Sequence, residues 1–213
     1  VVPHRLLHSL DSRVSKTFHV KNIFAHAFPL AGFRAIKLAA PQEKEYLFLD
    51  IAGEMTDTVM VKSGVISYVG SFSFGRNALI RAVAKSFSLP LEASVSLLSL
   101  HSKDMLDADT KTKIETLVRE ALITWRSEIE MIIKKNTGEM QFPQRVFVTV
   151  DDDVSFVFLS ALRNATGDER GVFQITNTMT ENSITYSKHV VPDPFLSLET
   201  LSVEYFLSNK NLQ

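Results

Sequence analysis

Two apolar runs joined by a short turn constrain the fold more than any other part of this chain. Residues 46–51 are apolar on both faces and too few for a helix, so they predict a buried strand, which carries one carboxylate, Asp50. A second strand is expected over 57–61 and a third over 65–74, with a glycine-containing turn at 62–64 between them. Strands that follow one another this closely form an antiparallel meander.

Helices and two more strands follow the meander. Apolar residues recur at helical spacing over 77–87, 91–100 and 109–135, and the longest of these segments carries a single apolar stripe. Two more buried strands are expected over 145–150 and 172–176. An edge strand is expected at 14–20, and helices are expected at 29–38 and 196–207. Ser155 is expected to cap a further helix. The long helix is expected to begin at a cap formed by Asp107 or Asp109 and to end at Gly138. This order indicates an α/β fold in which helices flank a mixed sheet.

Composition limits the classes of function. The chain has 213 residues and a net charge of -1, which argues against a nucleic-acid surface built on bulk basicity. It has no cysteine, so disulfides, thiolate metal sites and thiol nucleophiles are excluded, and its six histidines lack zinc-ligand spacing. No apolar run reaches the roughly 20 residues that a membrane span needs. The chain begins Val-Val-Pro with no signal-peptide core, so we expect a piece of a longer protein.

The turn after the first strand resembles the second phosphate loop of the actin-like ATPases, usually written Asp-x-Gly-x-Gly-Thr-x-Asp. In that family, backbone N–H groups of the loop surround the terminal phosphates, and acidic side chains hold Mg²⁺ through water. The resemblance assigns metal contacts to Asp50 and Asp57. It assigns nucleotide or phosphate contacts to Asp50, Gly53, Glu54, Thr56, Asp57, Gly75 and Arg76.

The family pattern is altered at these positions. Ala52 takes the first glycine position of the loop, and Glu54 and Met55 fill a place that is normally small. A glutamate carboxylate there repels a triphosphate unless a metal intervenes. Before the following helix the family has paired glycines, of which this chain keeps Gly75 and replaces the other by Arg76. Arginine can itself contact phosphate, so this replacement alone does not decide between binding and its loss.

The segments that resemble the nucleoside-binding parts of the family also depart from pattern. Glu92 is out of register with the family's Ala-Glu-x-x-Lys helix. After strand 145–150 the family has Gly-Gly-x-Ser, where this chain has three aspartates. The resemblance places Glu92, Asp151 and Asp152 on the adenosine side. Two other interpretations of the aspartates stay open: a site for a divalent cation, and a solvated turn whose charge favours the start of a helix.

The element order is similar to the second, C-terminal half of an actin-like ATPase, with the ribonuclease H-like fold. The nearest branch is the bacterial one that holds the cell-division protein FtsA and the pilus protein PilM. The resemblance implies one fragment over 1–213, with an actin-like core at 22–176 and a tail at 177–213 that contains a strand or short helix.

The resemblance, together with the altered nucleotide-binding motifs, implies a degenerate actin-like assembly or scaffold protein rather than an enzyme. ATP and Mg²⁺ are the cofactors it would hold. Protein partners are expected, self-assembly included, in a cytoplasmic cell-division or pilus-type complex that meets the inner face of the membrane only indirectly. Two alternatives stay open: an active ATPase half completed by a missing N-terminal half, and an unrelated α/β interaction module.

Overall fold

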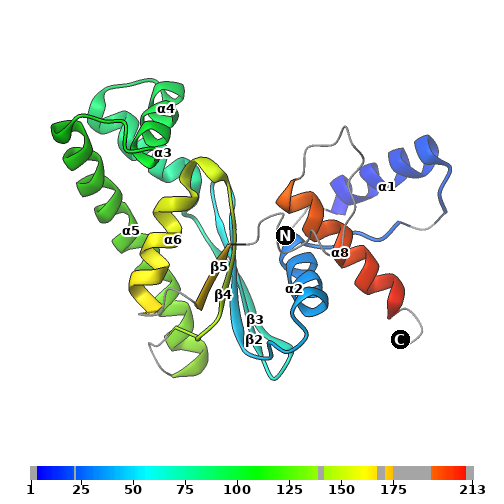
Figure 1. Cartoon of the computed structure of the whole chain (residues 1–213). Coiled ribbons are helices and arrows are strands. Elements are labelled where there is room, and N and C mark those ends of the chain that lie inside the picture. The colour runs from blue at the N-terminus through cyan, green and yellow to red at the C-terminus, as the bar shows by residue number, and fades with distance from the viewer. Residues whose placement is uncertain (1–3, 22, 139–141, 167–170, 175–192, 210–213) are drawn as a thin grey trace.

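A five-stranded mixed sheet forms the centre of the computed structural model, which describes residues 4–21, 23–138, 142–166, 171–174 and 193–209 (Figure 1). The strand order is β3-β2-β1-β4-β5. The strands are β1 (Tyr46–Ile51), β2 (Thr56–Lys62), β3 (Val65–Phe72), β4 (Val146–Val150) and β5 (Val172–Gln174). The predicted α/β class and the antiparallel meander are confirmed.

The sheet is antiparallel on one side of β1 and parallel on the other. β1 pairs antiparallel with β2 and parallel with β4, and β4 pairs parallel with β5. In this register Asp50 lies between Asp57 of β2 and Thr149 of β4. The two parallel strands therefore bring their carboxyl ends to one edge of the sheet, next to the turn that leads into β2.

Helices cover both faces of the sheet (Figure 1). One face belongs to the apolar cluster of α3 (Arg76–Phe87), α4 (Leu91–Ser102), α5 (Ala108–Thr137) and α6 (Asp152–Thr166). The other face packs against α2 (Phe28–Ala39) and α8 (Pro194–Ser208). Leu47 and Leu49 of β1 lie in the first cluster and Tyr46 and Phe48 in the second. This alternation explains why the sequence of β1 is apolar throughout.

The long helix α5 has the ends that the sequence predicts. The Asp107 carboxylate accepts a hydrogen bond from the Thr110 N–H at 2.9 Å, so it caps the first turn. Gly138 closes the helix with a φ of 80°, a left-handed conformation that glycine adopts without strain. The buried stripe of α5 contains Trp125, the single tryptophan of the chain.

Three expectations about elements are wrong. Residues 14–20 do not form an edge strand, because α1 (His4–Phe18) is a helix over most of that range. The apolar residues of α1 follow the helical period over a window longer than residues 14–20. Helix α6 begins at Asp152, so Ser155 lies inside its first turn and donates to the Asp152 carbonyl instead of capping. Strand β3 ends at Phe72, two residues early. Residues 175–176 of the last expected strand and 177–192 of the tail lie outside the described residues.

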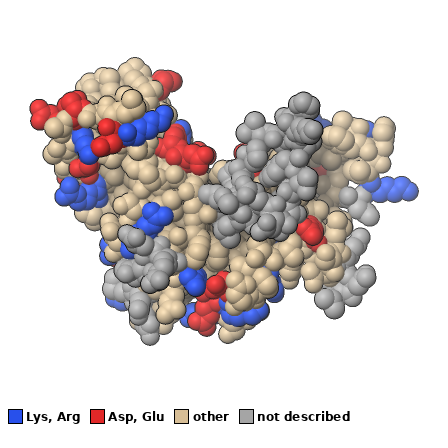
Figure 2. Space-filling model, viewed as in Figure 1, with Lys and Arg blue, Asp and Glu red and all other residues tan. Residues whose placement is uncertain are grey.

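Lys and Arg are interspersed with Asp and Glu on the face of the molecule in Figure 2. None of the described helices combines the length and apolarity that crossing a bilayer requires.

Candidate functional site

Carboxylates gather where β1 and β4 end. Asp50 is the fifth residue of β1, Asp57 opposes it on β2, and Asp151 follows β4 directly. The carboxyl ends of parallel strands are the usual place for a ligand site in an open α/β sheet. The resemblance assigns Asp50 and Asp57 to the phosphate and metal and Asp151 to the adenosine side, whereas the structure brings all three to this edge of the sheet.

Asp50 is the most buried member of this group, with 7% of its surface exposed. The Thr149 hydroxyl donates a hydrogen bond to Asp50 Oδ1 at 2.7 Å. Burial raises the pKa of Asp50 to about 6, because desolvation disfavours the charged form. The carboxylates of Asp57 and Asp151 act in the same direction, and the Thr149 hydrogen bond opposes them. This carboxyl group therefore changes protonation close to neutral pH.

The two neighbouring carboxylates show the same trend. Burial raises the pKa of Asp57 and also that of Asp151. At Asp151 the Arg76 guanidinium opposes this rise, whereas Asp193, which caps the N-terminus of α8, adds to it. Negative charge at this edge of the sheet is thus only partly compensated.

Arg76 supplies positive charge that partly compensates these carboxylates. Its Nε–H donates to both oxygens of Asp153 at 3.0 and 3.1 Å, and Nη2 donates to Asp153 as well. Its Nε also lies 3.3 Å from Asp151 Oδ2. Because Arg76 is the first residue of α3 and Asp153 the second of α6, this ion pair ties two helix N-termini together.

The turn between β1 and β2 is fastened to the start of α3 by backbone hydrogen bonds. The Arg76 N–H donates to the Ala52 carbonyl at 2.9 Å, and the Asn77 N–H donates to the Gly53 carbonyl at 2.8 Å. The close contact between the start of α3 and the turn requires a glycine at position 75. A Cβ atom there would lie 2.3 Å from the Ala52 oxygen and 2.7 Å from the Gly53 oxygen.

Glu54 fastens the same turn from the outside. Arg81 donates to its two carboxylate oxygens at 2.9 Å each, and the Asn77 side-chain amide donates to Oε1 at 3.0 Å. The hydrogen bonds from Arg81 and Asn77 lower the pKa of Glu54 to about 2. Glu54, which fills a position that is normally small in the family loop, thus forms an ion pair that holds the β1–β2 turn against α3.

These contacts decide whether the residues fit a nucleoside triphosphate with Mg²⁺. The two arginines nearest the turn, Arg76 and Arg81, already face carboxylates of the chain. The N–H groups of Arg76 and Asn77 at the start of α3 already donate to carbonyl oxygens of the turn. A phosphate would have to displace these acceptors and lie beside Asp50 and Asp151. The residues in this arrangement do not fit a triphosphate.

The other residues that the sequence singles out have different places. Thr56 is buried, accepts a hydrogen bond from the Trp125 indole N–H at 3.0 Å and donates to the Phe74 carbonyl at 2.6 Å. Glu92 is exposed in the first turn of α4, and its carboxylate makes no hydrogen bond or ion pair within the described part of the chain. Asp152 is exposed at the start of α6. No three His, Asp or Glu side chains among the described residues converge as metal ligands.

Sequence reasoning missed three residues of this site. Asn77 and Arg81 meet Glu54 across 23 and 27 residues, and no local pattern announces such a pairing. Thr149 did carry a signal, because it is a polar residue in the middle of an otherwise apolar buried strand.

Several solved structures share this architecture. Protein-family models and curated protein sequences give no match to the chain. The ethanolamine utilization protein EutJ from Carboxydothermus hydrogenoformans matches with a TM-score of 0.53 and 18% identity, over 84% of this chain and 53% of that chain. A structure of the PilM-PilN type IV pilus biogenesis complex matches with a TM-score of 0.58 and 16% identity, over 86% and 53%. The apo ParM protein of pSK41 matches with a TM-score of 0.54 and 15% identity, over 88% and 50%.

The chain has the fold of the actin-like ATPase superfamily. It spans about half the length of each of these three proteins. At these identities the similarity establishes the fold alone.

Proposed function

We propose that this chain is the actin-like module of an assembly or scaffold protein that does not turn over ATP. The observation that carries the proposal is the closure of the loop between β1 and β2 by Glu54, Arg81 and Asn77. In a working phosphate loop the backbone N–H groups face the nucleotide. Here the side chains of Arg81 and Asn77, which lie next to the loop, donate to the chain's own Glu54 carboxylate. The loop has become a structural joint between the sheet and α3.

The Arg76 ion pair supports the same conclusion. An arginine beside the terminal phosphates could stabilise the charge of phosphoryl transfer. In this chain Arg76 neutralises Asp153 and lies against Asp151, so its charge is used within the fold. Carboxylates at the strand ends then remain with too little positive charge nearby to accept a polyanion.

A fold that is kept while its nucleotide contacts are replaced is expected to work through protein contacts. One of the matching structures is a PilM-PilN type IV pilus biogenesis complex, in which an actin-like protein is bound to a partner. By analogy we propose a cytoplasmic protein whose partners belong to a pilus-type or cell-division complex, with membrane contact only through those partners.

ATP hydrolysis by the intact protein tests this proposal. Phosphate release should equal that of the buffer for the wild type and for Asp50→Ala, with both shown to be folded by circular dichroism. Turnover in the wild type that is lost in Asp50→Ala would contradict it.

That second result would support the other candidate, an ATPase half that is completed by further chain. One observation favours this candidate: Asp50, Asp57 and Asp151 have raised pKa values at one edge of the sheet, and a cation bound there would relieve their repulsion. Under this candidate Asp50 and Asp57 position the metal and its water.

A further inference from the structure

One buried side chain, Trp125, connects three parts of the fold: β2, α5 and α6. It belongs to the inner stripe of α5 and is fully buried. Its indole N–H donates to the Thr56 hydroxyl of β2 at 3.0 Å. Its ring meets Phe158 of α6 edge to face, with 5.0 Å between the ring centroids. A displacement of the indole therefore acts on the start of β2 and on both helices.

Thr56 is the residue through which Trp125 reaches the closed joint. It is the first residue of β2 and follows the turn that Glu54 holds against α3. Its hydroxyl accepts from Trp125 and donates at 2.6 Å to the carbonyl of Phe74, the residue before Gly75. Thr56 and Trp125 are both fully buried, so water cannot replace either partner when one of them moves. We therefore expect the turn, the start of α3 and the middle of α5 to move together.

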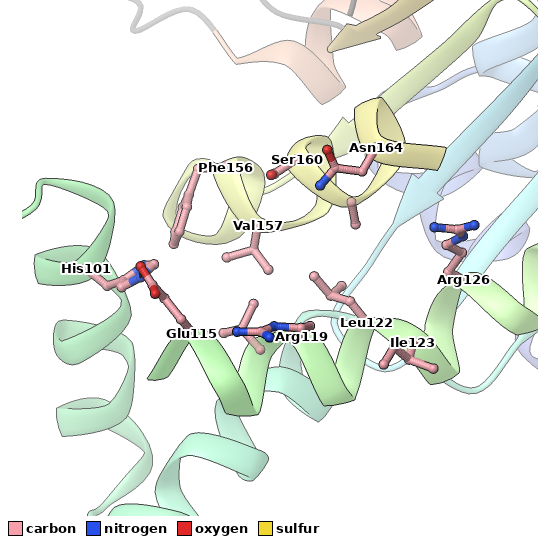
Figure 3. Close-up of a pocket in the computed structure, with 12 residues that line it drawn as sticks. His101, Glu115, Arg119, Leu122, Ile123, Arg126, Phe156, Val157, Ser160 and Asn164 are labelled. Atoms are coloured by element: carbon pink, nitrogen blue, oxygen red, sulfur yellow. Dashed lines mark ion pairs between the residues drawn. The ribbon is translucent and has the colours of Figure 1, made fainter. Parts of the chain in front are cut away.

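A groove between α5 and α6 lies on the same face of the sheet (Figure 3). Its volume is about 420 Å³, and its walls include Leu122 and Arg126 of α5 and Val157 of α6. Arg126 follows Trp125 directly in α5, and Val157 precedes Phe158 directly in α6. The contact between the two rings thus helps to set how far apart the walls of the groove stand.

We propose that Trp125 couples the joint at the β1–β2 turn to the width of the α5–α6 groove. When the joint opens, Thr56 moves with the turn and carries the indole with it, which shifts α5 against Phe158 of α6. A coupling of this kind acts in both directions, so whatever occupies the groove also favours one state of the joint. The inference rests on the proposed function, in which the joint is structural, and adds a route by which one site of the module controls another.

Double electron–electron resonance on the intact protein tests the inference by measuring the width of the groove. None of the 213 residues is a cysteine, so spin labels attach to this chain only at introduced positions. Ile123→Cys on α5 and Ser160→Cys on α6 are suitable, because both side chains are exposed and they belong to opposite walls of the groove (Figure 3). The distance between the two labels reports how far apart the helices stand.

Two substitutions open the joint. Gly75→Ala places a Cβ atom 2.3 Å from the Ala52 oxygen, and Glu54→Ala removes the carboxylate that Arg81 holds. In each variant the mean distance between the labels should shift by about 1–2 Å, the size of a helix shift at an interface. Glu120→Ala is the control, because it removes an exposed carboxylate of α5 outside the joint and the groove, and it should match the wild type.

Substitutions at Thr56 show whether the signal passes through its hydroxyl. Thr56→Val keeps the shape of the side chain and loses the hydroxyl, so in this background Gly75→Ala and Glu54→Ala should leave the distance between the labels unchanged. Thr56→Ser keeps the hydroxyl and should preserve the shift. A side chain that served only to fill the core would give the opposite ranking of the two backgrounds.

The same distance in the wild type, Gly75→Ala and Glu54→Ala would overturn the inference, as would a shift that persists in the Thr56→Val background. Should Gly75→Ala fail to fold, Glu54→Ala decides in the same way. ATP hydrolysis is measured separately on these proteins. Turnover in a wild type whose variants show the expected shift would refute the proposed function and leave the coupling in place.

Discussion

The Arg76 guanidinium holds the Asp153 carboxylate across 77 residues of chain, with Nε 3.0 Å from Oδ1. This pair joins the N-termini of α3 and α6 above the ends of β1 and β4. It also supplies positive charge beside Asp151. The contact therefore links the stability of the fold to the chemistry of the strand ends.

Replacing Arg76 by alanine should destabilise the protein. The pair is about three-quarters buried on both sides, so the loss should lie between that of an exposed and that of a buried ion pair, about 1–2 kcal/mol in the free energy of unfolding. Urea denaturation measures it. Arg76→Lys is the matched control, because it keeps the charge without the two-pronged geometry and should recover only part of the loss. Equal stability of all three proteins would contradict this role.

Gly75→Ala should disturb the loop between β1 and β2. The new Cβ would meet the Ala52 and Gly53 carbonyl oxygens, so the loop or α3 must shift, at a cost of about 1–3 kcal/mol. Gly138→Ala is the comparison, since its Cβ would meet nothing within 4 Å and only its φ of 80° is unfavourable. The expected ranking in thermal denaturation is wild type, Gly138→Ala, then Gly75→Ala; a reversed order of the two variants would refute the close contact.

The stability of the protein should depend on pH through Asp50. Its pKa of about 6 in the folded protein lies above the ordinary value of 3.8, so the folded state binds the proton more tightly than the unfolded state. The stabilising contribution of the protonated form is complete below about pH 4 and is lost as the pH rises through about 6. The size of this effect is about 1–3 kcal/mol.

Asp50→Asn tests this dependence, because asparagine can still accept the Thr149 hydrogen bond without a charge. The variant should be more stable than the wild type at pH 7.5, and the difference should shrink by pH 4.5. Asp11→Asn on the exposed helix α1 is the control. A wild type and an Asp50→Asn variant with parallel pH profiles would argue against a raised pKa.

Trp125 and Thr56 should be energetically coupled. The indole N–H donates to the Thr56 hydroxyl, and Thr56→Val would leave that N–H buried without a partner, at about 1–3 kcal/mol. Trp125→Phe removes the donor and adds a small cavity. In a double-mutant cycle the two losses should sum to more than the loss in the double variant. Unfolding is followed by circular dichroism, because Trp125 is the single tryptophan and its replacement removes the tryptophan fluorescence. Strictly additive losses would disprove the coupling.

The strands and the long helix could be predicted because their patterns are local. The apolar run of β1 and the stripe of α5 each report burial through spacing alone. Residues 14–20 of helix α1 were assigned wrongly because the helical period of its apolar residues shows only over a window longer than that segment. Near Ser155 the acidic residues at 152 and 153 begin α6 earlier than a serine cap would.

The site was predictable in part for the same reason. Asp50, Asp57, Gly75 and Arg76 stand next to strand or helix ends, and the order of elements brings such ends together. The partners that change the meaning of the site, Arg81 for Glu54 and Asp153 for Arg76, are 27 and 77 residues away. The sequence alone leaves an unconventional phosphate cradle open as an alternative, whereas the side-chain pairs of the structure form a closed joint.

Titration of the intact, folded protein with Mg²⁺-ATP by calorimetry tests the central claim most directly. Because Arg76 and Arg81 face carboxylates of the chain, and the N–H groups of Arg76 and Asn77 donate to carbonyl oxygens of the β1–β2 turn, we predict no binding heat up to millimolar nucleotide. Glu54→Gln, which frees Arg81, serves as the matched variant and shows whether the closed loop is what excludes the nucleotide. Wild-type binding near micromolar affinity, about -8 kcal/mol, would contradict the account and return the ATPase half to first place.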